Sequence, residues 1–134
     1  MPAPVSVVIP CFCSADTISR AVSSVLAQSL PPSEVILIDD ASPDNTLEIL
    51  YELQEEYGKQ RLKIIALTEN GGPGHARNMG WQAATQDYIA CLDADDAWHP
   101  DKLSLQFRCM QSHPEISLCG HPRTYQATWS AVYI

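Results

Sequence analysis

Short apolar runs recur along the chain, at residues 5–9, 35–38, 62–67 and 88–92. They are rich in valine, isoleucine and leucine, and prolines or acidic residues flank most of them. Runs of this length and composition are typical of buried β-strands. We therefore predict a strand at each run, and a fifth strand at residues 116–119.

Between these runs the apolar spacing changes to that of amphipathic helices. Ile18, Ala21, Val22, Val25 and Leu26 lie on one helical stripe. Further helices are expected over residues 43–57, 75–84 and 98–110. Strands that alternate with helices predict an α/β domain with a parallel sheet, right-handed crossovers and helices on both faces.

Composition and charge exclude several classes of protein. The chain has 134 residues and a net charge of −8, without a basic cluster. This argues against nucleic acid as a partner, because such proteins neutralise phosphates with lysine and arginine. No apolar run approaches the ~20 residues of a membrane span, and the N-terminus lacks the pattern of a secretory signal. We therefore expect a cytoplasmic location.

The five cysteines do not predict a disulfide framework or a zinc site, since they are odd in number and lack paired CxxC spacing. Cys11 and Cys13 have two interpretations, a redox pair or small side chains in a tight turn after the first strand. Cys91 and Cys119 lie in apolar runs and are expected in the core.

Acidic residues follow two of the predicted strands, as Asp39-Asp40 and as Asp93, Asp95 and Asp96. Carboxyl ends of parallel strands are where open α/β sheets bind ligands. Like charges placed this closely repel unless a cation or hydrogen-bond donors lie among them. A hard divalent cation that also binds phosphate would relieve the repulsion. A solvated acidic loop that caps the next helix is the alternative.

Five motifs in the same order resemble family 2 glycosyltransferases. They are VSVVIPCF at residues 5–12, SVLAQS at 24–29, EVILIDDASPDNT at 34–46, NGGPGHARNMG at 70–80 and LDADD at 92–96. The resemblance implies the GT-A fold, a Rossmann-like parallel sheet of order 3-2-1-4 with helices on both faces. It also implies that residues 1–134 are the nucleotide-diphospho-sugar-binding portion of one GT-A domain that is cut short, with the acceptor-binding half absent.

The resemblance assigns the nucleoside to residues after the first two strands. Pro10 and Phe12 would hold the base, with Phe12 stacked on it; an ordinary core aromatic is the alternative for Phe12. Asp40 would read the base through the imino N–H of uracil, although thymine carries the same group. Asp39 would support the loop or cap the next helix.

The diphosphate is assigned to the later motifs. Asn70 and the glycine-rich loop would approach the phosphates at a helix N-terminus. Arg77 resembles a nucleotide-contacting arginine, or it pairs with Asp40 or Asp93. Asp93-Ala94-Asp95 resembles the DxD motif, in which Asp93 and Asp95 would hold Mg²⁺ or Mn²⁺. Asp96 should point away and cap a helix, because successive side chains of an extended chain alternate.

The activity implied is metal-dependent transfer of a sugar from a nucleotide donor, expected to be a UDP-sugar, to an acceptor hydroxyl with inversion. The acceptor would be a saccharide or a lipid-linked sugar, in polysaccharide biosynthesis, with peripheral association at the inner face of the membrane as an option. The catalytic base is expected beyond Ile134. The alternatives are a nucleotide-sugar-binding fragment without turnover and an unrelated Rossmann-like nucleotidyltransferase. Residues 124–134 either begin a missing half or dock on the sheet edge.

Overall fold

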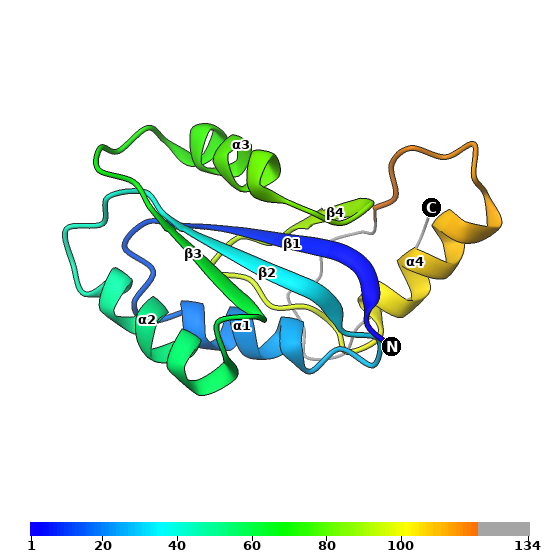
Figure 1. Ribbon diagram of the computed structural model, residues 1–134, viewed down its shortest axis with the longest axis horizontal. Coiled ribbons are helices and arrows are strands. Elements are labelled where there is room, and N and C mark those ends of the chain that lie inside the picture. The colour runs from blue at the N-terminus through cyan, green and yellow to red at the C-terminus, as the bar shows by residue number, and fades with distance from the viewer. Residues whose placement is uncertain (121–134) are drawn as a thin grey trace.

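The computed structural model describes residues 1–120, and within them every helix follows a strand. The order is β1 (Ala3–Cys11), α1 (Ile18–Leu26), β2 (Pro32–Asp39), α2 (Thr46–Tyr57), β3 (Leu62–Ala66), α3 (Pro73–Ala83), β4 (Tyr88–Cys91) and α4 (Lys102–Ser112). The strands are parallel and lie in the order β3-β2-β1-β4 (Figure 1). The predicted α/β fold and strand order are confirmed.

The two central strands, β1 and β2, are buried on both faces of the sheet. Their alternate residues point to opposite sides, and each side packs against helices. Val7 and Ile9 of β1 pack with the apolar stripe of α1 and with residues of α2. Val8 points the other way and packs with Ala76 of α3. Figure 1 shows α1 and α2 on one side of the sheet and α3 on the other. This arrangement leaves the carboxyl ends of the strands facing loops.

Helix α3 approaches the sheet closely at Gly80. A Cβ atom placed on Gly80 would lie 2.5 Å from Cγ1 of Val8 and 2.7 Å from Cδ1 of Ile38. The absence of a side chain therefore lets the backbone of α3 lie directly on β1 and β2. The beginning of α3, at Pro73, lies at the end of the glycine-rich loop.

A buried carboxylate joins the strands near their amino ends. Glu34 of β2 accepts hydrogen bonds from the Ser6 hydroxyl at 2.6 Å and from the Thr85 N–H and hydroxyl at 2.7 and 2.8 Å, and it pairs with Lys63. Burial alone would raise the pKa of Glu34, but these donors outweigh it and lower the pKa to about 2. The network fixes the end of the sheet opposite to the predicted site.

Some expectations about the later part of the chain are wrong. Residues 116–119 form no strand. Cys91 is exposed and Cys119 is only half-buried. Among the described strands β4 pairs with β1 alone, so the outer edge of the strand that carries Cys91 is open. Residues 124–134 lie outside the described part of the chain. None of the helices described is long and apolar enough to cross a membrane.

Candidate functional site

A hollow of about 640 Å³ lies where β1, β2 and β4 end and α3 begins, and we call it the strand-end hollow. Its volume is within the range of roughly 300–1,000 Å³ that is usual for small-molecule sites. Every residue assigned to ligand binding from the sequence lines it: Pro10, Phe12, Asp40, Asn70, Arg77, Asp93, Ala94 and Asp95. The fold therefore brings together groups that lie up to 85 positions apart in the sequence.

The loop after β1 carries Phe12 at the rim of the hollow. The N–H of Cys13 donates to the Ser42 hydroxyl at 3.0 Å, and the N–H of Ser14 donates to Thr46 Oγ1 at 3.0 Å. These bonds fix the loop to the segment that begins α2. Phe12 is 51% exposed, so it is not a core aromatic, and its ring is available for stacking.

Asp40 is buried at the base of the hollow and holds the glycine-rich loop. Its Oδ1 accepts from the Gly71 N–H at 2.8 Å and its Oδ2 from the Gly72 N–H at 2.9 Å. The side-chain amide of Asn70 donates to the Asp40 carbonyl at 3.1 Å. A carboxylate has about four lone-pair sites, and two of those of Asp40 are used, so it retains capacity for a further donor. Its role in reading a base stays a prediction.

Asp39 lies beside Asp40 but does not line the hollow. Its Oδ2 accepts from the Ser42 N–H at 3.4 Å, which agrees with the expected support of the loop. Its Oδ1 is buried without a hydrogen-bond partner in the described part of the chain. Burial, together with the charge of Asp39, raises the pKa of the Cys11 thiol to about 12. Cys11 therefore stays protonated at neutral pH, which argues against a redox pair with Cys13.

Arg77 reaches the hollow from the second turn of α3. Its Nη2 donates to Oδ1 of Asp93 at 3.0 Å, so one of the pairings anticipated for Arg77 is present. The side chains of Arg77 and Asp93 are 39% and 46% exposed. Ion pairs this exposed contribute only about 0–1 kcal/mol. The guanidinium can therefore turn toward a phosphate at small cost.

Asp93, Asp95 and Asp96 form a compact group that we call the acid triad. Each offers a carboxylate oxygen, and these oxygens lie within 4.8 Å of one another. The expectation that Asp96 points away is therefore wrong. Its N–H donates to the Asp93 carbonyl at 3.0 Å, so the chain turns here instead of continuing as an extended strand. Carboxylate oxygens are the ligands that Mg²⁺ and Mn²⁺ prefer, and the triad fits such an ion.

Two contacts near the triad were not anticipated from the sequence. Nη2 of Arg20 donates to the Asp95 carbonyl at 2.6 Å, and the Ser24 hydroxyl accepts from the Trp98 N–H at 3.0 Å. Both side chains project from α1. The available signal was their spacing of four residues, which places them on the same side of a helix.

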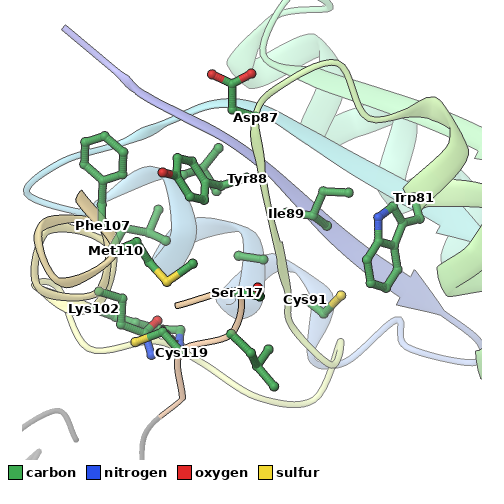
Figure 2. A pocket seen from close by; sticks show the side chains of 15 residues that line it. Trp81, Asp87, Tyr88, Ile89, Cys91, Lys102, Phe107, Met110, Ser117 and Cys119 are labelled. Atoms are coloured by element: carbon green, nitrogen blue, oxygen red, sulfur yellow. Dashed lines mark hydrogen bonds between the residues drawn. The ribbon is translucent and has the colours of Figure 1, made fainter. Parts of the chain in front are cut away.

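A second hollow, of about 550 Å³, lies along the open edge of β4 (Figure 2). Trp81, Ile89, Phe107 and Met110 contribute apolar side chains to it. Asp87 is the one carboxylate among its described lining residues. The strand-end hollow differs from it, because it combines an arginine with several carboxylates that could hold a cation.

Comparisons with known proteins agree with this geometry. Residues 6–132 match the model of glycosyl transferase family 2. The chain is 42% identical over 106 residues to the putative teichuronic acid biosynthesis glycosyltransferase TuaG of Bacillus subtilis, covering 79% of this chain and 41% of that protein.

Solved structures give the same result. The structure of S. aureus TarS 1-349 in complex with UDP matches with a TM-score of 0.74 and 30% identity, over 85% of this chain and 33% of that one. Mannosyltransferase PcManGT from Pyrobaculum calidifontis, in complex with GDP-Man and Mn²⁺, matches with a TM-score of 0.74 and 27% identity, over 82% and 34%. The chain thus spans between a third and two fifths of the length of these relatives.

Proposed function

The chain belongs to glycosyl transferase family 2, and on that premise we propose that residues 1–134 bind the nucleotide-diphospho-sugar donor of a metal-dependent, inverting sugar transfer. The donor proposed is a UDP-sugar, and the acceptor is a hydroxyl of a saccharide or a lipid-linked sugar. Family membership removes the unrelated nucleotidyltransferase from the alternatives. A binding fragment without turnover remains the second candidate.

One observation carries the proposal: a single hollow collects an aromatic ring, a buried carboxylate, an arginine and two members of the acid triad, Asp93 and Asp95. The ring at Phe12 is suited to stacking on a base, a contact worth roughly 1–3 kcal/mol. Asp40 lies in the same hollow and can accept an imino N–H of uracil. The relative solved with UDP supports a uridine nucleotide here, and the relative solved with GDP-Man and Mn²⁺ supports a divalent ion.

Other residues of the hollow are suited to the diphosphate. Arg77 can leave its exposed pair with Asp93 and donate to a phosphate oxygen. Gly72 and Pro73 place the N-terminus of α3 at the hollow, where helix N–H groups favour an anion. Asp93 and Asp95 would hold Mg²⁺ or Mn²⁺, which supplies positive charge where negative charge develops on the departing nucleoside diphosphate.

Inversion by direct displacement also requires a general base that deprotonates the acceptor hydroxyl. We assign no residue of this chain to that role. The proposal therefore predicts binding of the donor by residues 1–134, with the acceptor site and the base supplied by other residues. A transfer or donor-hydrolysis assay separates turnover from binding alone.

Calorimetric titration tests the proposal. We expect UDP to bind more tightly with Mn²⁺ or Mg²⁺ present than with a chelator, and a UDP-sugar to bind in the same way. ADP and a dinucleotide serve as controls, because a carboxylate at the base site does not match adenine. Binding without metal dependence, or a preference for the dinucleotide, would overturn the proposal.

A further inference from the structure

Beyond the residues that line the hollow, we propose that Arg20, Ser24 and Gln28 act as positioning residues for the acid triad. We call these three side chains the α1 ladder. They lie at intervals of four residues, on and just after α1, and contact the segment between β4 and α4, residues 92–101, which we call the acidic loop. The inference rests on the proposed function, because it assigns the ladder a role in metal-dependent donor binding.

The ladder contacts the acidic loop at successive points along its length. Arg20 donates to the carbonyl of Asp95 at 2.6 Å, and the Ser24 hydroxyl accepts from the Trp98 N–H at 3.0 Å. The Gln28 side-chain amide donates to the His99 carbonyl at 2.7 Å. Each side chain of the ladder therefore bonds a different main-chain group of the acidic loop. The order of these contacts is the same along α1 and along the loop.

Gln28 also fixes the beginning of α4. Its Oε1 accepts from the Leu103 N–H at 3.0 Å, one of the first-turn N–H groups that a helix cannot satisfy internally. Asp101 occupies the N-cap position of α4 without a side-chain capping bond. Gln28 is only 5% exposed, so its amide lies between the two helices. The residue after it, Ser29, donates its N–H to the Pro100 carbonyl at 2.8 Å.

The acidic loop needs such external support because of its charge. Three carboxylates with oxygens within 4.8 Å repel one another and favour a more open loop. β4 ends at Cys91, and α4 begins only at Lys102. The ladder holds the loop on the α1 side, and Arg77 contacts Asp93 from α3. In Figure 1 the segment after β4 passes α1 before it enters α4. The geometry thus preforms the metal ligands before any ion arrives.

The test measures Mn²⁺ affinity in the presence of UDP, and UDP affinity in a chelator, for the full chain and for variants. Ser24→Ala removes the hydroxyl that accepts from Trp98. Its matched control is Ser33→Ala, which removes another half-buried hydroxyl, one that donates to the Ala3 carbonyl at 2.7 Å away from the acidic loop. Gln28→Met keeps the length of the side chain and removes its amide. Ser24→Thr restores a hydroxyl.

We expect Ser24→Ala to weaken Mn²⁺ binding about 5-fold, which is the usual effect of losing one hydrogen bond. Gln28→Met should weaken Mn²⁺ binding about 10-fold or more, which is the usual loss when a residue that orients metal ligands is changed. UDP affinity in the chelator should stay unchanged in both variants. Ser33→Ala and Ser24→Thr should retain the Mn²⁺ affinity of the unaltered chain. A purely structural role would lower both affinities together.

Arg20→Ala gives an independent test at an exposed position, and with Ser24→Ala it keeps the inference testable if Gln28→Met does not fold. Loss of a cation beside three carboxylates would by itself tighten Mn²⁺ binding, whereas loss of positioning weakens it. The inference is overturned if Arg20→Ala tightens Mn²⁺ binding, or if Ser24→Ala and Ser33→Ala have the same Mn²⁺ affinity. It is also overturned if a ladder variant loses UDP affinity in the chelator by the same factor as it loses Mn²⁺ affinity. If the unaltered chain lacks metal-dependent UDP binding, the proposed function itself fails.

Discussion

At the scale of single residues, Asp40 has the most constrained position in the strand-end hollow. It is 2% exposed, and each carboxylate oxygen accepts one N–H from the glycine-rich loop. A ligand that adds a third donor meets an acceptor that is already oriented. A base that presents a lone pair at the same point would be repelled. Asp40 thus combines support of the loop with the proposed selection of uracil.

Asp40→Ala is expected to weaken the binding of uridine nucleotides more than the binding of free diphosphate. Loss of a hydrogen bond to a charged group costs about 1.5–3 kcal/mol, or roughly 10- to 150-fold in affinity. Calorimetry with UDP and with pyrophosphate, both in Mn²⁺, measures the two losses. Asp87→Ala, which removes an exposed carboxylate just before β4, should change neither. Equal losses for the two ligands would contradict base reading.

Asp95→Ala is expected to abolish the increase in UDP affinity that Mn²⁺ produces. The chain should stay folded, because Asp95 is exposed and its removal lessens repulsion within the acid triad. Titrations with and without metal, together with a thermal unfolding curve, provide the measurement. Unchanged UDP affinity in excess Mn²⁺ would exclude Asp95 as a metal ligand.

The residues of the hollow were predictable because they belong to local motifs at strand ends. The parallel sheet then brings the motifs together. Asp96 was misjudged because the prediction assumed an extended chain where a turn forms between Asp93 and Asp96. Arg20 and Ser24 were missed because their partners lie more than 70 positions away, in a loop without regular structure. Contacts of this kind depend on tertiary packing and not on local pattern.

At the scale of elements, the position of α3 decides how the glycine-rich loop meets the sheet. Gly80 lies in direct contact with Val8 and Ile38, and the first turn of α3 borders the strand-end hollow. A displacement of the helix would therefore move Arg77 and the loop together. The sequence predicted this helix closely, since residues 75–84 were expected and Pro73–Ala83 is observed.

Gly80→Ala is expected to destabilise the fold by about 1–3 kcal/mol, the usual cost of overpacking. Its Cβ would lie 2.5 Å from Val8 Cγ1, too close to be accommodated without movement. Gly74→Ala, in the same helix, meets nothing within 4 Å, and it should be neutral or stabilising by up to about 1 kcal/mol. Urea unfolding followed by circular dichroism compares the two. Equal midpoints would refute close packing at Gly80.

The strand predicted at residues 116–119 is absent for a reason that also concerns whole elements. Residues 116–119 have a suitable apolar composition, but a strand exists only through a partner, and composition alone does not supply one. Within residues 1–120 the outer edge of β4 has no paired strand. The four strands that were predicted correctly each pair with at least one neighbour in the sheet, and each is followed by a helix.

At the scale of the whole molecule, acidic groups have opposite roles at the two ends of the sheet. Near the amino ends of the strands, Glu34 is buried and satisfied by four donor contacts, including Lys63. At the carboxyl ends, the acid triad lies close together beside the open hollow. One end therefore contributes stability, and the other is the proposed ligand site.

Stability should fall as the pH is lowered through the range in which Glu34 becomes protonated. The pKa of Glu34 is about 2 in the folded protein, whereas its ordinary value is 4.5. Because the folded pKa is the lower one, the contribution is complete above pH 4.5 and is lost as the pH falls toward 2. The loss amounts to about 3 kcal/mol.

Urea unfolding at a series of pH values measures this effect, and Glu34→Gln is the comparison. Other carboxylates also titrate in this range, so the prediction concerns the difference between the two proteins. The variant should be less stable at neutral pH and should depend less steeply on pH. Parallel curves for the two proteins would show that Glu34 does not contribute.

Crowded carboxylates at the end of β4 have a consequence for anyone who modifies this chain. In the absence of an ion their mutual repulsion disfavours the folded state, so a neutral replacement at the exposed Asp95 would make the protein more stable. Directed evolution for heat tolerance or expression yield alone would then drift toward variants that lack a proposed ligand of the ion. Screens on this scaffold should include a nucleotide and a divalent salt from the first round.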